Sequence, residues 1–196
     1  MKINFIGSPC SGKTTTAAMV FADLKELGIS CEFVVEQARL YIANKRYTQS
    51  KLKITNNSIT LTDQDQLQIL KNQIQIENIF QISCDEETIL ICDSSPFNSL
   101  FYMTNQTRSQ ESTQNTIQEI ITNADVIFYA PPVDRSYEID VNRIHDENQS
   151  KQIDILIPEI MKQVAPEVWN KVIPLTGNPK ERLRQVTSVI LTRRLK

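Results

Sequence analysis

Short apolar runs alternate along the chain with longer stretches in which apolar residues recur at helical spacing. The runs are rich in Ile, Val and Phe and lack regular alternation with polar residues, which is typical of strands buried on both faces of a parallel sheet. The predicted strands are Lys2–Ile6, Cys31–Val35, Thr88–Cys92, Val126–Tyr129 and Val172–Leu175. The predicted helices are Lys13–Leu27, Gln37–Lys45, Asp63–Ile82, Glu111–Thr122, Lys151–Val164 and Pro179–Leu191. This order predicts an α/β fold with three layers, in which a doubly wound, parallel five-stranded sheet is the middle layer.

Turn and cap signals mark the segments between these elements. Thr62 is followed three residues later by Asp65, a spacing that resembles a capping box at the start of the long Gln-rich helix. Gly28 follows the first helix, where it is well placed as a C-terminal cap. Two polar segments lack apolar periodicity. We interpret residues 46–62 as a loop or flexible flap, and residues 131–150 as a mobile lid.

Composition limits the classes of function. With 196 residues, 40% of them hydrophobic and 22% charged, the chain (1–196) is predicted to be one globular domain. A formal net charge of −2 argues against a general nucleic-acid-binding surface. No signal peptide is visible, and no apolar stretch approaches the ~18 residues that a membrane span needs. The four cysteines lack metal-type spacing and are interpreted as free thiols in a reducing cytoplasm. The sequence leaves the oligomeric state open, and an oligomer is compatible with it.

A phosphate-binding motif follows the first strand. Residues 7–14 read Gly-Ser-Pro-Cys-Ser-Gly-Lys-Thr and match G-x-x-x-x-G-K-[ST] between a strand and a helix. Consecutive backbone N–H groups and a helix N-terminus are expected to hold the phosphates of ATP, with Lys13 between the β- and γ-phosphates and Thr14 on Mg²⁺. The motif and the sheet together predict a P-loop NTPase. The residues expected to contact the nucleotide are Gly7, Ser8, Pro9, Cys10, Ser11, Gly12, Lys13, Thr14 and Thr15.

Acidic residues follow two of the predicted strands. Asp93 ends the apolar run Thr-Ile-Leu-Ile-Cys, which is the Walker B pattern, so Thr14 and Asp93 are the expected metal ligands. Glu36 follows the second strand, where a carboxylate can orient a substrate hydroxyl or accept its proton. Arg39 lies one turn later and could bind an anionic group of the substrate. The alternative for Glu36 and Arg39 is an ion pair at the surface of a helix N-terminus.

The lid carries arginines that could neutralise charge on the transferring phosphate. Arg143 is the candidate catalytic residue, and Arg135 is a candidate for substrate binding or for the same catalytic role. The alternative is a solvated polar loop. His145, the single histidine, is interpreted as a hinge or surface residue rather than a base.

The chain resembles the kinase domain of the NadR group, the ribosylnicotinamide kinases and their AAA-like relatives within the nucleoside/nucleotide kinase superfamily. The Glu36–Tyr41 segment matches the E-x-A-R-x-Y pattern of that group. The other matching segments are Gly7–Thr14, Ile91–Ser95, Ala130–Pro132, Arg143–Glu147 and Gly177–Leu183. Where the group carries a second acid after the third strand, this chain has Ser95. The resemblance therefore supports the kinase machinery better than a nicotinamide substrate.

Two classes of function remain, and a third is less favoured. The leading hypothesis is an ATP-dependent kinase that phosphorylates a hydroxyl or phosphate of a small nucleoside- or nucleotide-like substrate. The rival is a P-loop ATPase that acts as a nucleotide-dependent regulatory switch, which should hydrolyse ATP slowly and need no acceptor. A kinase acting on a modified base in DNA is the third, and the acidic composition argues against it.

Overall fold

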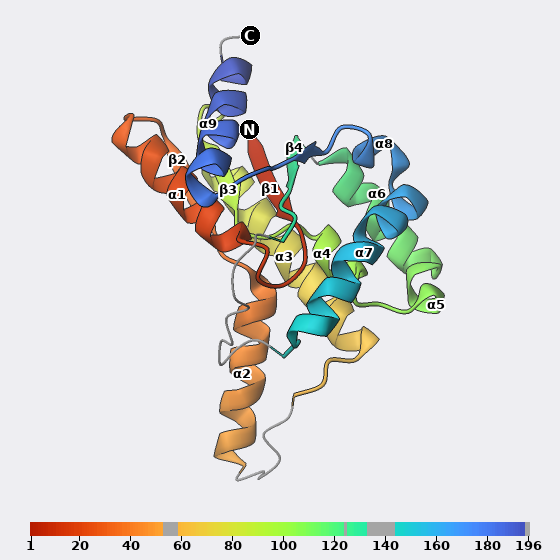
Figure 1. Cartoon of the computed structure of the whole chain (residues 1–196). Coiled ribbons are helices and arrows are strands. Elements are labelled where there is room, and N and C mark those ends of the chain that lie inside the picture. Colours follow the sequence, from red (N-terminus) through yellow and green to blue (C-terminus); the bar gives the residue numbers. More distant parts are fainter. Residues whose placement is uncertain (53–58, 124, 133–143, 195–196) are drawn as a thin grey trace.

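A parallel sheet forms the centre of the molecule. The computed structural model describes residues 1–52, 59–123, 125–132 and 144–194 (Figure 1). In these residues five parallel strands pair in the order β2-β3-β1-β4-β5. The strands are β1 (Lys2–Ile6), β2 (Cys31–Val34), β3 (Ile89–Cys92), β4 (Val126–Tyr129) and β5 (Ile173–Pro174). The predicted α/β class and all five predicted strands are confirmed, and some strand ends shift by one residue.

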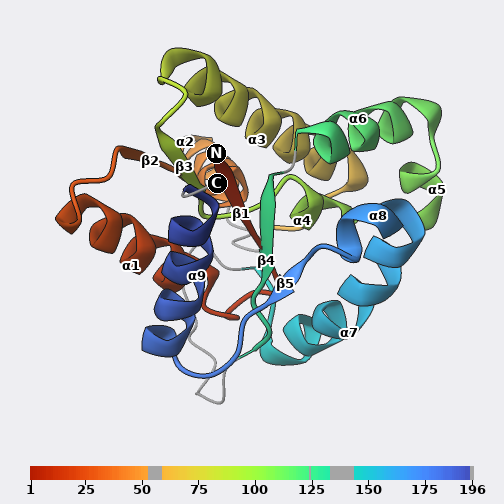
Figure 2. The ribbon, with the colours of Figure 1, turned by 90° about the horizontal axis from the view of Figure 1, so that it is seen from above.

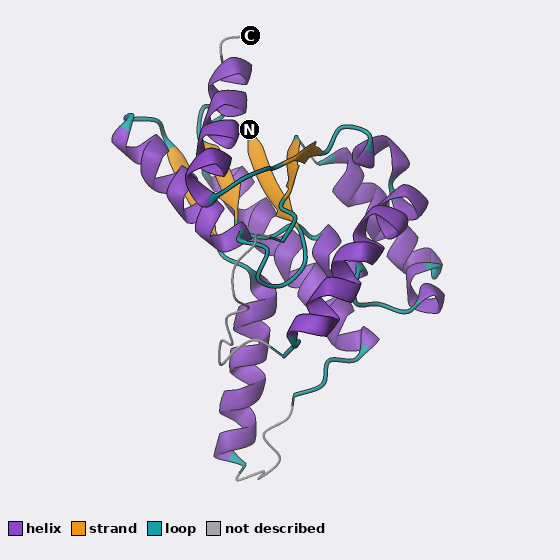
Figure 3. Ribbon diagram, in the orientation of Figure 1, coloured by secondary structure: helices purple, strands orange, loops and turns teal. Residues whose placement is uncertain are grey.

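Helices surround the strands, which are orange in Figure 3. They are α1 (Lys13–Glu26), α2 (Gln37–Lys51), α3 (Asp63–Ser83), α4 (Phe97–Leu100), α5 (Asn105–Arg108), α6 (Glu111–Thr122), α7 (Glu147–Val164), α8 (Pro166–Trp169) and α9 (Pro179–Arg194). The short helices α4, α5 and α8 were not predicted, because four residues are too few to show a helical period.

Different helices cover the two faces of the sheet (Figure 2). On one face, Ile3 and Phe5 of β1 pack in a buried cluster with residues of α1 and α9, such as Val186. On the other face, Ile6 packs with residues of α3, α4, α6, α7 and α8, such as Ile157. Because successive side chains of a strand point to opposite faces, β1 contributes to both clusters, as the doubly wound arrangement predicts.

The order of the strands fixes where a ligand can bind. β1 lies between β3 and β4 in the sheet. The strands β2 and β3 are therefore on one side of β1, and β4 and β5 are on the other, so the strand order reverses at β1. In open α/β sheets such a switch point opens a crevice at the carboxyl ends of the strands. The loop after β1 and the residues that follow β2 and β3 all lie at these carboxyl ends.

The predicted flap at residues 46–62 is wrong in its first part, because α2 continues to Lys51. Lys45 Nζ and Tyr41 Oη both bind the Asp65 carboxylate of α3, at 2.9 and 2.6 Å. These contacts anchor the first half of α2. The residues after Lys45 continue the helix with little burial, which is why no apolar period revealed them. Residues 53–58 of the flap lie outside the described residues.

The structure confirms the two predicted helix caps but moves the predicted start of one helix. Thr62 and Asp65 form the predicted capping box, and Gly28 has the left-handed φ of 70° expected of a C-terminal cap. By contrast, α7 begins at Glu147 rather than at the predicted Lys151, because Asp146 starts an unrecognised capping box. Residues 133–143 of the predicted lid lie outside the described residues.

Candidate functional site

The loop between β1 and α1 folds back on itself. Cys10 and Gly12 have positive φ angles of 61° and 88°, which turn successive peptide groups in unusual directions. Gly7 approaches the end of β4 so closely that a Cβ atom there would lie 2.5 Å from the carbonyl oxygen of Ala130. A side chain at position 7 would therefore displace the loop from the sheet. The first glycine of the motif is required by this close approach.

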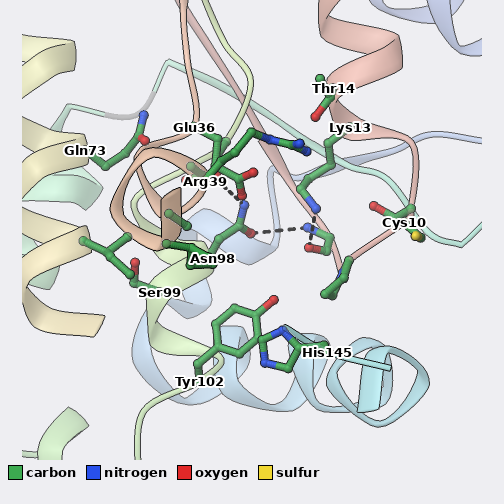
Figure 4. A pocket seen from close by; sticks show the side chains of 18 of the residues that line it. Cys10, Lys13, Thr14, Glu36, Arg39, Gln73, Asn98, Ser99, Tyr102 and His145 are labelled. Carbon is green, nitrogen blue, oxygen red and sulfur yellow. Dashed lines mark hydrogen bonds between the residues drawn. The ribbon is translucent and has the colours of Figure 1, made fainter. Parts of the chain in front are cut away.

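Lys13 points into this loop. Its Nζ atom donates hydrogen bonds to the carbonyl oxygens of Gly7 at 2.9 Å and Ser8 at 2.8 Å (Figure 4). Lys13 is also the first residue of α1, so its ammonium group and the positive end of the helix dipole face the same space. A phosphate group in the loop would meet both charges.

Side chains from two distant segments support the loop. Asn98 of α4 accepts a hydrogen bond from the Gly7 N–H at 3.4 Å and donates to the Phe5 carbonyl oxygen at 3.2 Å. Ser150 of α7 donates to the Pro9 carbonyl oxygen at 2.6 Å. The loop is therefore fixed to β1, α4 and α7 as well as to its own helix.

Asp93 directly follows β3 and is buried beside the loop, with 4% of its surface exposed. Its Oδ2 atom accepts a hydrogen bond from the Thr14 hydroxyl at 3.0 Å. Burial, and after it the negative charge of Glu36, raise the pKa of Asp93 to about 6 when all the influences on it are taken together. The Thr14 hydrogen bond and the charges of Lys13 and Arg39 oppose these effects on the pKa. These side chains from three parts of the chain therefore share one electrostatic environment.

This group of residues fits a hard cation. Asp93 Oδ1 is buried and has no hydrogen-bond partner in the described part of the chain, although a buried carboxylate oxygen normally has one. A hydroxyl, a carboxylate and a second carboxylate nearby are the oxygen ligands that Mg²⁺ prefers. No group of three or more His, Cys, Asp or Glu residues in the described ranges could enclose a metal alone. An Mg²⁺ ion here would need oxygens from phosphate and water as well.

Glu36 lies at the N-terminus of α2, two residues after the end of β2, and its carboxylate makes no capping hydrogen bond. The buried side chain of Gln73 fixes the backbone next to Glu36. Gln73 of α3 accepts a hydrogen bond from the Gln37 N–H at 3.1 Å and donates one to Glu77 at 3.0 Å. Glu77 in turn forms a buried ion pair with Lys2 of β1 at 3.1 Å. The position of Glu36 is thus tied to the core of the sheet.

One pocket of about 300 Å³ joins these parts (Figure 4). Residues of the phosphate loop line one side, and Glu36 and Arg39 line another. The far wall is built from α3, α4 and the segment before α7. Tyr102 and His145 stack there with ring centroids 4.8 Å apart. The far wall also contains Gln66, Ile69, Gln73 and Ser99, and Ile42 of α2 lines the pocket as well.

A family model described as an AAA domain (AAA_28) matches residues 2–182 of the chain. The protein belongs to this AAA domain family. The sequence resemblance to the NadR group and its AAA-like relatives is therefore confirmed.

A solved structure with a TM-score above 0.5 agrees with the fold of this AAA domain. The crystal structure of NadR protein in complex with NR has a TM-score of 0.61 and 19% sequence identity, covering 90% of this chain and 46% of the NadR chain. The chain thus spans less than half the length of NadR. Shikimate kinase from Acinetobacter baumannii in complex with shikimate is also similar, with a TM-score of 0.48 and 16% identity over 100% of this chain and 95% of that one. None of the curated proteins is similar enough in sequence to count as a match.

Most of the predicted site residues of the AAA domain meet in the pocket. The loop residues Gly7 to Thr15, except Ser8, line it, together with Glu36 and Arg39. Asp93 lies just behind, joined to Thr14. Arg135 and Arg143 lie outside the described residues, so their predicted roles remain predictions. The interpretation of His145 as a hinge or surface residue is corrected, because the imidazole is half-buried in the pocket wall against Tyr102.

Sequence reasoning missed the amide side chains of the site. Asn98, Gln66 and Gln73 are all at least nine-tenths buried. Their signal was available, because Gln66, Ile69 and Gln73 share one face of a helix at the spacing of apolar core residues. Glutamine at such positions indicates a polar role inside the protein.

In the described parts of the chain no helix is both long and apolar enough to cross a membrane.

Arg182 of α9 was also missed as a support for the phosphate loop. The guanidinium is 2% exposed and donates to the carbonyl oxygens of Ser11 at 2.7 Å, Pro131 at 2.7 Å and Gly177 at 3.1 Å. It therefore joins three loops at the carboxyl end of the sheet. A planar group with several donors in a fixed geometry suits this task.

Arg182→Met is expected to lower the free energy of unfolding by roughly 2 kcal/mol, because it keeps the apolar volume but leaves buried carbonyl groups without a donor. The melting temperature should fall by about 4–8 °C for a domain of this size. Calorimetry of the purified variant measures both quantities. Arg184→Met in the same helix is the matched control, since Arg184 is exposed. Equal melting temperatures for the two variants would show that Arg182 does not hold the loops together.

Proposed function

We propose that this AAA domain protein is an ATP-dependent kinase that transfers the γ-phosphate to a hydroxyl of a small nucleoside- or nucleotide-like acceptor. One observation carries the proposal. The pocket does not end at the phosphate loop but continues past Glu36 to a separate wall formed by α3 and α4. A protein that only hydrolyses ATP needs room for a water molecule there. A kinase needs a second binding space of this kind, beside the phosphate that is transferred.

The donor half of the proposed reaction uses the phosphate loop. Backbone N–H groups of the loop and the N-terminus of α1 bind the triphosphate, and Lys13 neutralises charge on the oxygens of the transferring group. Mg²⁺, when bound with ATP at Thr14 and Asp93, would neutralise the remaining phosphate charge. The unpartnered Asp93 Oδ1 and the Thr14–Asp93 contact of 3.0 Å support this assignment.

The acceptor half uses Glu36. Its carboxylate lines the pocket between the loop and the far wall, and it lies near enough to Asp93 to raise the pKa of that residue. From there it holds the acceptor hydroxyl toward the γ-phosphate and takes its proton as the new O–P bond forms. The bond between the γ-phosphorus and the oxygen that bridges it to the β-phosphate breaks in the same step, and ADP leaves. Arg39, which lies one helical turn away in the same wall, binds a polar group of the acceptor.

The lid arginines complete the proposal. Arg143 and Arg135 belong to a segment that begins at the end of β4 and ends at α7, next to the phosphate loop. We propose that Arg143 stabilises the charge of the transferring phosphoryl group and that Arg135 contacts the substrate. The support for these two roles is their order in the sequence and the family resemblance.

Acceptor-dependent release of ADP tests the proposed function. The purified chain is incubated with ATP and Mg²⁺, with and without a panel of nucleosides, nucleotides and small polyols. A kinase releases ADP much faster with one acceptor than without any. A slow rate that no acceptor changes would contradict the proposal and favour the regulatory ATPase.

Asp93→Asn is expected to raise the Mg²⁺ concentration needed for half-maximal activity by roughly 10-fold or more, because it removes a charged ligand while keeping its shape. The melting temperature should change little, since burial already disfavours the charged form of Asp93. Mg²⁺ titrations of activity, with Glu87→Gln as an exposed acidic control, measure the effect. An unaltered Mg²⁺ dependence would reduce Asp93 to a residue that only caps β3.

A further inference from the structure

Gln66 differs from the other buried amides of the site. The residue is 5% exposed and lines the pocket, yet its side-chain amide makes no hydrogen bond with any described residue. A glutamine amide offers two donor hydrogens and an acceptor oxygen. Polar side chains of nearly buried residues are normally hydrogen-bonded, and the Gln66 amide is open to a further partner on the side of the pocket. An unpaired amide that faces a pocket is therefore available for a ligand.

Gln73 provides the contrast on the same helix. It lies seven residues after Gln66 and lines the same pocket, but both ends of its amide already have partners, Gln37 and Glu77. Gln73 therefore holds the protein together, whereas the amide of Gln66 is bonded to none of the residues that the structure describes. Ser99, 5% exposed, also lines the pocket with a hydroxyl that bonds to no described residue.

The surroundings of Gln66 suit a flat, uncharged group. Ile42 and Ile69 supply apolar surface, and the stacked rings of Tyr102 and His145 supply an aromatic wall. Burial lowers the pKa of His145, which favours the neutral imidazole near neutral pH. Aromatic and branched aliphatic side chains bind planar rings by stacking and by excluding water.

Among the described residues, the charges that line this part of the pocket favour an uncharged acceptor over an anionic one. Beyond the phosphate loop, the charged residues among the described lining residues are Glu36 and Arg39. A nucleotide acceptor would bring a phosphate dianion toward the Glu36 carboxylate. Proteins that bind such dianions normally present several cations to them. Amides and hydroxyls are more numerous here, and they suit neutral polar groups.

We propose that Gln66 selects the acceptor, and that its side-chain amide hydrogen-bonds the edge of an uncharged planar ring of the kind found in a neutral nucleoside. The ring lies against Tyr102 and Ile69, and the sugar hydroxyls extend toward Glu36 and the phosphate loop. This inference rests on the proposed kinase function, which it narrows from nucleoside- or nucleotide-like acceptors to neutral nucleosides.

Binding and turnover are measured separately, so that this inference and the kinase proposal can fail independently. Binding of individual nucleosides and of their 5′-monophosphates is followed by calorimetry with Mg²⁺ and a non-hydrolysable ATP analogue present. Turnover is followed by ADP release with the same compounds. We expect at least one neutral nucleoside to bind and react with a kcat/KM at least about tenfold above that of its monophosphate.

Gln66→Leu tests the role of the amide. The variant is expected to weaken nucleoside binding roughly 10- to 100-fold, because the base edge loses its partner. Affinity for the ATP analogue alone should stay within about twofold, since Gln66 lies on the acceptor side of the pocket. The melting temperature should be unchanged or higher, because no hydrogen bond of the protein is lost. Gln68→Leu is the matched control, since Gln68 lies on the exposed side of α3 and bonds to Asn72.

The outcomes separate the alternatives. Nucleoside binding that Gln66→Leu weakens, without any ADP release, would support the inference and overturn the kinase function. ADP release with monophosphates or acidic polyols in preference to neutral nucleosides would support the kinase function and overturn the inference. No binding of any neutral nucleoside, or equal losses in Gln66→Leu and Gln68→Leu, would also overturn it.

Discussion

Replacement of Lys13 by alanine is expected to abolish phosphoryl transfer, with a loss of at least roughly 10²-fold in kcat. Charge grows on the γ-phosphate oxygens as the phosphoryl group moves, and Lys13 carries the ammonium group that points into the phosphate loop. The fold should survive, because Lys13 bonds to loop carbonyls and belongs to none of the buried clusters. ADP release under saturating acceptor, measured beside a thermal melt, tests both statements.

Lys25→Ala is the control for this experiment. Lys25 is in the last turn of the same helix and is exposed, so its loss should leave the catalytic rate unchanged. If Lys13→Ala kept near wild-type turnover, the loop of residues 7–14 would not be the site of phosphate transfer. A variant that lost activity only because it unfolded would show a lowered melting temperature.

The second large effect is expected from Glu36→Gln. This change keeps the size of the side chain and one acceptor oxygen but removes the ability to take a proton, a loss that costs roughly 10²-fold or more in rate. The affinity for ATP should change little, because Glu36 lies on the acceptor side of the triphosphate in the proposed arrangement. Binding of an ATP analogue and phosphorylation of the acceptor are measured on one preparation, so that the two effects can be compared directly.

The binding and transfer measurements on Glu36→Gln also show which other role Glu36 has if it is not the catalytic base. Intact transfer by Glu36→Gln would remove Glu36 from the reaction. Lost Mg²⁺ binding would place it in the metal shell beside Asp93, whose pKa it already influences. Glu32→Gln is a suitable control, since Glu32 is a half-buried acid on β2, the strand that precedes Glu36.

The fold was largely predictable because its signals are local. The strands of a parallel sheet are short apolar runs, and the phosphate loop is a motif with fixed spacing between a strand and a helix. Helix ends were harder, because α2 continues to Lys51 through exposed residues that carry no apolar period. Its anchors are contacts with Asp65 of α3, and a sequence pattern does not show contacts between separate helices.

The donor half of the site was predictable, whereas the acceptor half was predictable only in Glu36 and Arg39. Asp93 and Glu36 were found because polar residues at the ends of parallel strands meet at one edge of the sheet. Gln66 was not found, because a glutamine in a Gln-rich helix is distinguished only by burial, which depends on the elements that pack against α3, such as α2 and α4. The stacking of Tyr102 with His145 joins residues far apart in the chain. A local sequence pattern does not predict that two such distant residues stack.

The hydrogen bonds of Arg182 have a consequence for synthesis of the protein. The ribosome makes the phosphate loop among the first residues of this chain, whereas the guanidinium that holds the carbonyl groups of Ser11 and Pro131 comes from α9, the last helix. A nascent chain can therefore form β1 and α1 early but cannot complete the support of the loop until α9 has emerged and docked. The ability to hold ATP firmly should consequently appear only after α9 has left the ribosome, and not when β1 and α1 first form.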